Sequence, residues 1–175
     1  MFELRELEEK DVNTINEWRN REELISTLGA TFRYINQDVE KEWYQNYLKN
    51  RNSTVRCAIV EKNEDKILGL ISLTGINQFN QSATLHIMVG EKSNQGRGLG
   101  TFAIKKMMNH SFYNLNLRRI EFTVLSSHTR AISLYQKCGF KIEGKKEKAV
   151  FKNGEFHDMT MMALLKENFR STDDE

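Results

Sequence analysis

Three alternating glycines carry the clearest chemical signal in this sequence. Gly96, Gly98 and Gly100 follow the apolar stretch 85–89 and precede residues 101–108, whose apolar positions recur at helical spacing. The order strand, glycine loop and helix aims several backbone N–H groups at one anion, with the positive helix end behind them. Glycine suits such a loop because it allows close approach and adopts positive φ. We therefore predict an anion-binding loop, and an ordinary flexible connection is the simpler alternative.

A dinucleotide is one candidate for the anion, because residues 98–103 match the pattern G-x-G-x-x-A. The context argues against it, since polar residues 91–95 separate the glycines from the strand and the loop lies mid-chain. The acidic residue expected about 20 positions later would be Glu121, which lies inside the next apolar run. The sequence also lacks the Gly-Lys-Ser/Thr of a P-loop.

Composition excludes several other classes of protein. The 175 residues predict one domain over residues 1–170, followed by a frayed polar tail at 171–175. A net charge of +2 gives no electrostatic case for a nucleic-acid or membrane partner, and no apolar run approaches the ~20 residues of a membrane span. Cys57 and Cys138 are too few and too far apart for a disulfide framework or a zinc site. We expect a cytoplasmic protein with reduced thiols and no metal.

Hydrophobic periodicity predicts the elements that position the loop. Helices are expected at 12–21, 37–49, 101–114 and 131–138. Strands are expected at 2–7, 55–60, 67–73, 83–89, 119–125, in a return strand that begins at 140–144 and ends at 148–151, and at 156–164. The resulting order, β-α-α-β-β-β-α-β-α-β-β, predicts an α+β fold with a mixed sheet. The strands on either side of the helix after the loop should be parallel.

Local signals refine these elements. Asp11, Asn36 and Thr129 are suited to cap the helices that follow them. Asn153-Gly154 is a strong hairpin turn between the last two strands. The apolar side of the second helix is predicted to consist of Val39, Trp43, Tyr47 and Leu48.

Two motifs resemble one known family. Gln95-Gly96-Arg97-Gly98-Leu99-Gly100 resembles the acyl-CoA loop, Gln/Arg-x-x-Gly-x-Gly/Ala, of the GNAT superfamily of N-acetyltransferases. A second family signature, Ala131-x-x-Leu134-Tyr135-x-x-x-Gly139-Phe140, follows at its usual distance. The element order agrees, and so do Trp18-Arg19-Asn20 and the ending around Asn153-Gly154 and Asp158. The subgroup that this sequence resembles contains ribosomal-protein N-terminal, spermidine and amino-sugar acetyltransferases.

The resemblance implies a GNAT-like, mostly antiparallel sheet flanked by helices, with acetyl-CoA as cosubstrate. The reaction implied is acetyl transfer to a primary amine, either of a small molecule such as an amino sugar or of a protein N-terminus. A backbone N–H of Met88 or Val89 would polarise the acetyl carbonyl. The CoA-binding residues implied by the resemblance are Ile87, Met88, Val89, Gln95, Gly96, Arg97, Gly98, Leu99, Gly100, Thr101, His128 and Tyr135. His128 departs from the family, which usually has asparagine there.

Proton transfer is assigned to two candidates. Tyr135 matches the family tyrosine that protonates the departing sulfur, and its alternative is a tyrosine that only packs its helix. The position at which many relatives carry a glutamate base holds Thr84. His86 lies two residues further on the same side of the strand, and its ordinary pKa near 6.5 suits a base. Glu121, ordered waters, or a histidine that merely bonds to the sheet remain alternatives.

The acceptor should lie against the first two helices, their connection and the last hairpin. Between Glu23 and Asn36 the connection holds no carboxylate, but it holds Arg33 flanked by Phe32 and Tyr34. We therefore expect Arg33 and Tyr34 to bind an anionic or neutral acceptor, such as an amino sugar carried on a nucleotide, in preference to a polyamine. A peptide N-terminus remains open, and so does a merely solvated Arg33.

Two other functional hypotheses stay open at the level of sequence. One is a non-catalytic acyl-CoA sensor or scaffold, which the departures at Thr84 and His128 would suit. The other is nicotinamide-cofactor binding through the glycine loop. A homodimer formed by sheet-edge pairing of the C-terminal hairpin is expected only by analogy.

Overall fold

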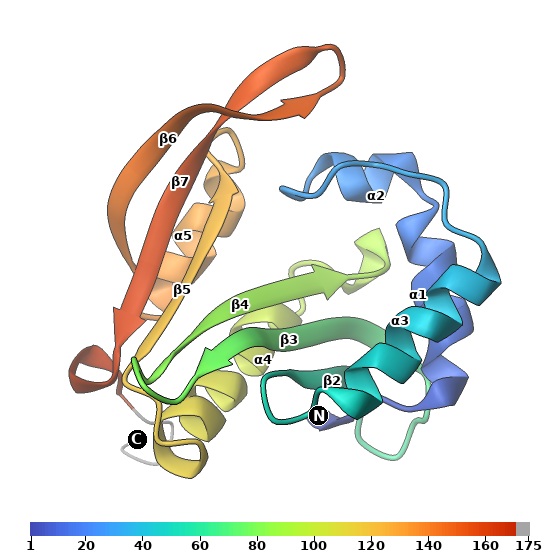
Figure 1. Cartoon of the computed structure of the whole chain (residues 1–175), viewed down its shortest axis with the longest axis horizontal. Coiled ribbons are helices and arrows are strands. Elements are labelled where there is room, and N and C mark those ends of the chain that lie inside the picture. Colours follow the sequence, from blue (N-terminus) through green and yellow to red (C-terminus); the bar gives the residue numbers. More distant parts are fainter. Residues whose placement is uncertain (171–175) are drawn as a thin grey trace.

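A mixed sheet of seven strands organises residues 1–170, the part of the chain that the computed structural model describes. Its order is β1-β2-β3-β4-β5-β7-β6, and every neighbouring pair is antiparallel except β4 with β5, which is parallel (Figure 1). The strands are β1 (Phe2–Glu6), β2 (Val55–Glu61), β3 (Ile67–Asn77), β4 (Ser82–Val89), β5 (Arg119–Leu125), β6 (Lys141–Lys152) and β7 (Glu155–Leu165). The α+β class and the parallel crossover are confirmed. The predicted tail at 171–175 lies outside the described residues.

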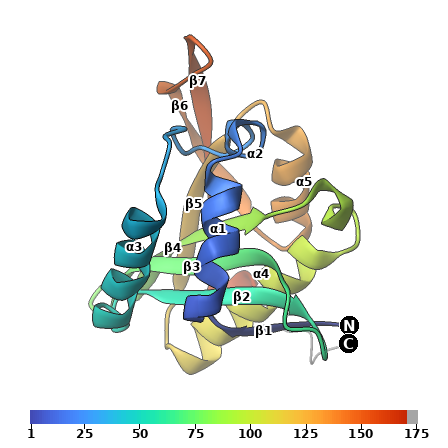
Figure 2. The ribbon, with the colours of Figure 1, turned by 90° about the vertical axis from the view of Figure 1, so that its right-hand side faces the viewer.

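Helices cover both faces of this sheet (Figure 2). They are α1 (Val12–Arg19), α2 (Glu22–Ser26), α3 (Gln37–Lys49), α4 (Leu99–Asn109) and α5 (Thr129–Lys137), with a π-helical turn at His110–Asn114. The first three lie on one face, and α4 with α5 lies on the other. Within residues 1–170, none of these helices combines the length and the apolar character that crossing a membrane demands.

Two hydrophobic cores follow from the alternation of side chains along the central strands. Ala58 and Leu70 face α1 and α3, whereas their chain neighbours Ile59 and Ile71 face α4. Successive side chains of a strand point to opposite faces, so strands covered on both sides must be apolar at nearly every position. This explains why β2 and β3 read as continuous apolar runs.

β4 and β5 pair over only three residues of each strand. Residues 82–84 are matched with residues 119–121, and β4 then continues to Val89 without β5 beside it. β4 still pairs with β3 along its other edge, from Ser82 to Val89. The edge of β4 that faces away from β3 is therefore free of strand pairing over its last five residues.

The predicted caps have mixed outcomes. Asn36 caps α3 as expected, because its side chain accepts the N–H of Val39 at 2.9 Å. Asp11 does not cap α1, since its carboxylate accepts two 2.8 Å hydrogen bonds from Arg5 and one from the backbone N–H of Glu8. Thr129 is already the first residue of α5 and provides no side-chain cap.

The helical region before β2 also differs from expectation. α2 is an additional short helix, in a stretch for which no helix was predicted. On α3, Tyr47 is buried and Trp43 packs against the core, as predicted. Val39 and Leu48, however, are 53% and 42% exposed, and Glu40 and Tyr44 are buried. Glu40 is buried on this face of α3 because it forms an ion pair with Arg19 of α1. A pattern of hydrophobic residues cannot predict such a pair. The predicted hairpin turn is confirmed, with positive φ of 52° at Asn153 and 82° at Gly154.

Candidate active site

A cavity of about 1270 Å³ lies beside the separation of β4 and β5. Its wall is built by β3, β4 and β5, the glycine loop, the first turn of α4, α5, and the segment from α2 to α3. The cavity brings together most residues predicted to form the site: His86, Ile87, Met88, Val89, Gln95, Gly96, Gly98, Leu99, Gly100, Thr101, His128, Tyr135 and Arg33. Arg97 and Tyr34 are not part of its lining. Tyr34 is 87% exposed and packs edge-on against Phe32.

The glycine loop presents a free helix N-terminus to this cavity. Gly98 precedes α4 in the left-handed conformation, with φ of 82°, and no side chain caps the helix. The first hydrogen bond of α4 runs from the N–H of Phe102 to the carbonyl of Gly98 at 3.0 Å. The N–H groups of Leu99, Gly100 and Thr101 therefore have no acceptor within the helix, which is the arrangement that binds a phosphate.

The arginine that accompanies this loop is not the one within it. Arg97 turns away, because its guanidinium pairs with Glu61 at 2.5 Å and lies 5.5 Å from the ring centre of Phe2. Arg130, from the first turn of α5, lines the cavity, and a methyl group added at Gly96 would lie 3.4 Å from its Nη2. Arg130 was not predicted, although it directly precedes Ala131, the first residue of the second family signature.

Tyr135 reaches the cavity from α5. Its ring packs on Phe122, with 4.3 Å between ring centres, and burial raises the pKa of its phenol to about 12. Within residues 1–170 its hydroxyl has no hydrogen-bond partner, so the O–H is available to a molecule in the cavity. A phenol with this pKa stays protonated at neutral pH. His128, at the start of the same helix, also lines the cavity.

A polar row crosses the floor of the cavity on the face covered by α1 and α3. Arg56 of β2 is directly opposite Ser72 of β3, which in turn is opposite His86 of β4. Arg56 donates a hydrogen bond from Nη1 to the Ser72 hydroxyl at 3.3 Å. His86 Nε2 lies 2.9 Å from the hydroxyl of Thr74, whose own opposite residue is Thr84.

His86 is poised in its neutral form. The surrounding protein disfavours the imidazolium, and the positive charge of Arg56 adds to this, so the pKa of His86 lies below its ordinary 6.5. Glu121, the other predicted base, is paired with Arg119 at 2.6 Å and is not part of the cavity lining. The cavity therefore holds a neutral imidazole, whereas this carboxylate is engaged elsewhere.

Three residues at the α3 end of the cavity were not predicted. The guanidinium groups of Arg19 and Arg56 lie 4.2 and 4.5 Å from the ring centre of Trp43. Arg19 also forms a 2.6 Å ion pair with the fully buried Glu40. All three of Arg19, Trp43 and Arg56 line the cavity. Their meeting depends on packing between α1, α3 and β2, so sequence spacing carried no signal for it.

Comparison with known proteins accounts for this geometry. The family model for an acetyltransferase (GNAT) domain matches residues 2–141 of the chain. The chain belongs to the GNAT acetyltransferase family. Spermidine N(1)-acetyltransferase of Vibrio cholerae is 29% identical over 166 residues, covering 95% of this chain and 94% of that protein. The putative ribosomal N-acetyltransferase YdaF of Bacillus subtilis is 28% identical, covering 59% of this chain and 56% of its own.

Solved structures agree with the family assignment. The crystal structure of the Vibrio cholerae spermidine N-acetyltransferase in complex with CoA and spermine superimposes with a TM-score of 0.89 at 28% identity, covering 95% of this chain and 96% of that one. This GNAT protein is an N-acetyltransferase that uses acetyl-CoA, as expected. Its own residues fit that cosubstrate, because uncapped N–H groups of α4 and the guanidinium of Arg130 face the same cavity and suit a diphosphate.

Proposed function

We propose that this enzyme transfers the acetyl group of acetyl-CoA to the primary amine of a small molecule. One observation carries the proposal. A single cavity is lined both by the uncapped N-terminus of α4, which is suited to bind a phosphate, and by the polar row on β2, β3 and β4. The unpaired part of β4, residues 85–89, lines the same cavity. A donor held at α4 and an amine held at the polar row would therefore meet beside β4.

Binding of acetyl-CoA is assigned to backbone groups and one cation. The diphosphate would accept hydrogen bonds from the N–H groups of residues 99–101 and pair with Arg130. The pantetheine arm would lie along residues 87–89, where the strand edge is unpaired. A backbone N–H of Met88 or Val89 would then stabilise the negative oxygen that forms during acetyl transfer.

Two side chains would move the protons. The amine nitrogen attacks the thioester carbon, and the C–S bond breaks as the new C–N bond is completed. His86 would take the proton that the nitrogen loses, which its lowered pKa allows at neutral pH. Tyr135 would give its phenolic proton to the departing sulfur, and the proton held by His86 then restores the phenol through the cavity. The products are the N-acetylated amine and CoA with a free thiol.

The first test replaces Tyr135 with Phe. Loss of a general acid typically lowers turnover by about 10²–10⁴-fold, so we expect a fall in kcat of that order with unchanged affinity for CoA. The rate at which the free thiol of CoA is released gives kcat, and titration calorimetry gives the affinity for CoA. Tyr113→Phe is the matched control, because Tyr113 is 55% exposed and lies outside the cavity. Equal turnover in the two variants would remove Tyr135 from the acid role.

A polyamine acceptor is the second candidate. It is favoured by the relatives, because the Vibrio cholerae protein is a spermidine N(1)-acetyltransferase and was solved in complex with spermine. The same thiol assay across polyamines, amino sugars, amino acids and short peptides ranks the acceptors by kcat/KM. A protein N-terminus would appear in this panel as preference for the peptides.

Two broader expectations are retained as proposals. A homodimer through the C-terminal hairpin is supported by the position of β6 at the sheet edge and by the exposed, mutually packed rings of Phe151 and Phe156. A cytoplasmic location is supported by the free thiols of Cys57 and Cys138.

A further inference from the structure

The charges that line the acceptor side of the cavity are all of one sign. Arg19, Arg33 and Arg56 line it, beside the neutral imidazole of His86. Among residues 1–170, no aspartate or glutamate is part of the lining. Like charges repel more strongly where water is partly excluded, so a cationic acceptor would enter against this field. An acceptor with a negative group would instead be attracted.

Arg19 and Arg56 differ in how their charge is compensated. Arg19 has a dedicated counter-ion, since Glu40 is fully buried and lies 2.6 Å away. Arg56 forms no ion pair with the described residues, and its Nε is buried without a hydrogen-bond partner. Burial and the charge of Arg19 together lower the pKa of Arg56 to about 10, so the guanidinium remains protonated at neutral pH. Arg56 is therefore a half-buried cation without a counter-ion, and an anion bound in the cavity that it lines would compensate its charge.

The position of Arg56 is fixed before any ligand arrives. Its guanidinium lies 4.5 Å from the ring centre of Trp43, and its Nη1 donates to Ser72. Cation–π contact and a hydrogen bond to the neighbouring strand hold the planar group in one orientation. A guanidinium held in this way can offer its remaining N–H groups to a carboxylate or phosphate with little loss of conformational entropy.

The sheet register also sets a length for the acceptor. Arg56, Ser72 and His86 are directly opposite one another on three successive strands. Neighbouring strands lie about 4.8 Å apart, so the backbones at Arg56 and His86 are roughly 10 Å apart. An amine at His86 and an anion at Arg56 would therefore be separated by roughly 5–10 Å, which is one to two strand spacings.

We propose that the acceptor carries a carboxylate or a phosphate that binds Arg56, while its primary amine reaches His86. This inference rests on the proposed function and specifies its substrate class. Arg19, already paired with Glu40, acts through Trp43 as a support for Arg56. The acceptor is then a short amine with an anionic end, and a polyamine is the disfavoured alternative.

The experiment compares matched acceptors with the wild-type enzyme in the thiol-release assay. The acceptors are 1,4-diaminobutane, spermidine, 4-aminobutanoate, 5-aminopentanoate, glucosamine and glucosamine 6-phosphate. We expect at least a 10-fold higher kcat/KM for the acceptor with an anion than for its uncharged or cationic counterpart. Comparing the two amino acids with glucosamine 6-phosphate shows whether a carboxylate or a phosphate is preferred. Comparing 4-aminobutanoate with 5-aminopentanoate tests the distance between the amine and the anion.

Arg56→Met and Arg56→Lys give the second arm. We expect the KM of the preferred anionic acceptor to rise at least 30-fold in Arg56→Met and to recover partly in Arg56→Lys, with the KM of acetyl-CoA unchanged. Arg118→Met is the control, because Arg118 is an exposed arginine outside the cavity. Melting temperatures check that both Arg56 variants and the control are folded.

The outcomes separate this inference from the proposed function. Efficient acetylation of spermidine or diaminobutane, with slower acetylation of every anionic amine, would overturn the anion-binding role and leave the acetyltransferase proposal standing. An equal KM for anionic acceptors in Arg56→Met and Arg118→Met would also overturn it. Release of CoA with none of the amines would contradict the proposed function itself.

Discussion

At the scale of single residues, the surroundings of His86 and Tyr135 change their acid–base behaviour in opposite and useful directions. The protein around His86 and the charge of Arg56 favour the neutral imidazole, which is the form that accepts a proton. Burial beside Phe122 favours the protonated phenol of Tyr135, which is the form that donates one. Both groups are therefore in their working protonation state at neutral pH.

The pH dependence of the reaction tests the role of His86. A base must be neutral, so activity is lost as pH falls through its pKa, and a lowered pKa moves this loss to more acidic pH. In the wild-type enzyme we expect kcat/KM to fall at acidic pH with a midpoint below pH 6.5. In His86→Gln this fall should disappear, and kcat/KM at neutral pH should be lower than in the wild-type enzyme. Rates between pH 5 and 9 measure it. His110→Gln, at a histidine outside the cavity, is the control, and an unchanged acidic limb in His86→Gln would exclude His86 as the base.

At the scale of elements, α4 can bind an anion because no side chain caps its first turn. A Ser, Thr, Asp or Asn at the N-cap position can satisfy one of the first N–H groups of a helix, whereas Gly98 precedes α4 and provides no side chain. The left-handed φ of 82° at Gly98 turns the chain into the helix at the edge of the cavity. An element that lacks its own cap thereby keeps donors for an external anion.

Gly98→Ala tests this element. A side chain in the left-handed region costs roughly 1–2 kcal/mol, and relief of that strain would move the N–H groups. We expect at least a 10-fold weaker affinity for CoA by calorimetry. Gly154→Ala is a matched control, because Gly154 also has φ of 82° and open space around its Cα, but it lies in the hairpin turn outside the cavity. Similar loss of stability in both variants with unchanged CoA affinity in Gly98→Ala would contradict the assignment.

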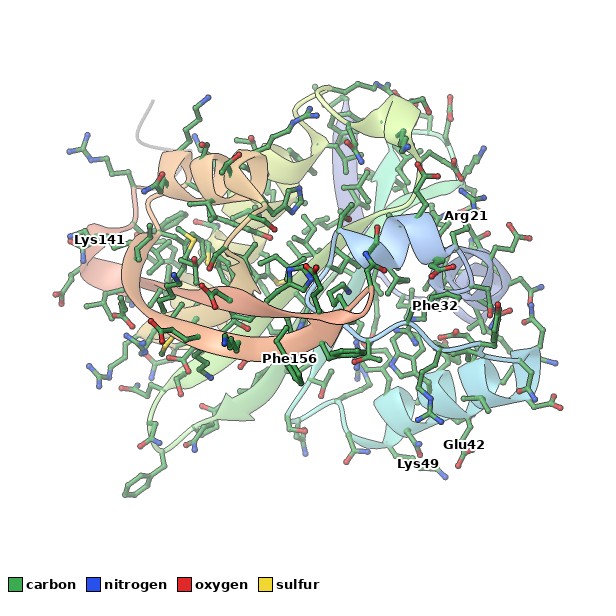
Figure 3. All side chains as sticks on the ribbon, turned by 90° about the horizontal axis from the view of Figure 1, so that it is seen from above. Arg21, Phe32, Glu42, Lys49, Lys141 and Phe156 are labelled. Atoms are coloured by element: carbon green, nitrogen blue, oxygen red, sulfur yellow. The ribbon has the colours of Figure 1, made fainter. Side chains whose placement is uncertain are left out.

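At the scale of the whole molecule, the acceptor side of the cavity is closed by segments far apart in sequence. The hairpin of β6 and β7 extends across the molecule toward the segment that carries Phe32 (Figure 3). Lys152, near its end, is only 8% exposed and donates hydrogen bonds to the carbonyls of Ile25 and Ala30, at 2.9 and 2.5 Å. These two residues belong to the wall of the cavity. The hairpin thus holds the α2 region in place.

Lys152→Met is expected to loosen this wall. Hydrogen bonds from a charged group contribute about 1.5–3 kcal/mol, so the free energy of unfolding should fall by about 1–3 kcal/mol. The KM of the acceptor should rise while that of acetyl-CoA stays constant, because α4 and α5 do not contact Lys152. Denaturant melts and steady-state kinetics measure the two effects. Lys146→Met, at an exposed lysine of the same strand, should change neither, and parallel behaviour of the two variants would refute the bridging role.

The sequence by itself determined the features that depend on nearby residues. The glycine loop, the Asn153-Gly154 turn, the Asn36 cap and the order of elements other than α2 were predictable, because positive φ, capping and hydrophobic period act within a few positions. The two family motifs added acetyl-CoA and the enzyme class. The same reasoning failed at Asp11, whose carboxylate pairs with Arg5, and in part on α3, where Glu40 is buried while Val39 and Leu48 are exposed.

Only the tertiary structure decided which side chains share the cavity. Arg97 lies within the loop yet pairs with Glu61, whereas Arg130 reaches the loop from another helix. Arg56 meets Trp43 and Ser72 because strand register and helix packing bring β2, α3 and β3 together. The physical reason is that side-chain direction follows from long-range pairing and packing, which are cooperative properties of the whole chain. Local sequence fixes the conformation of a loop or a turn, but it does not say what lies across the cavity from it.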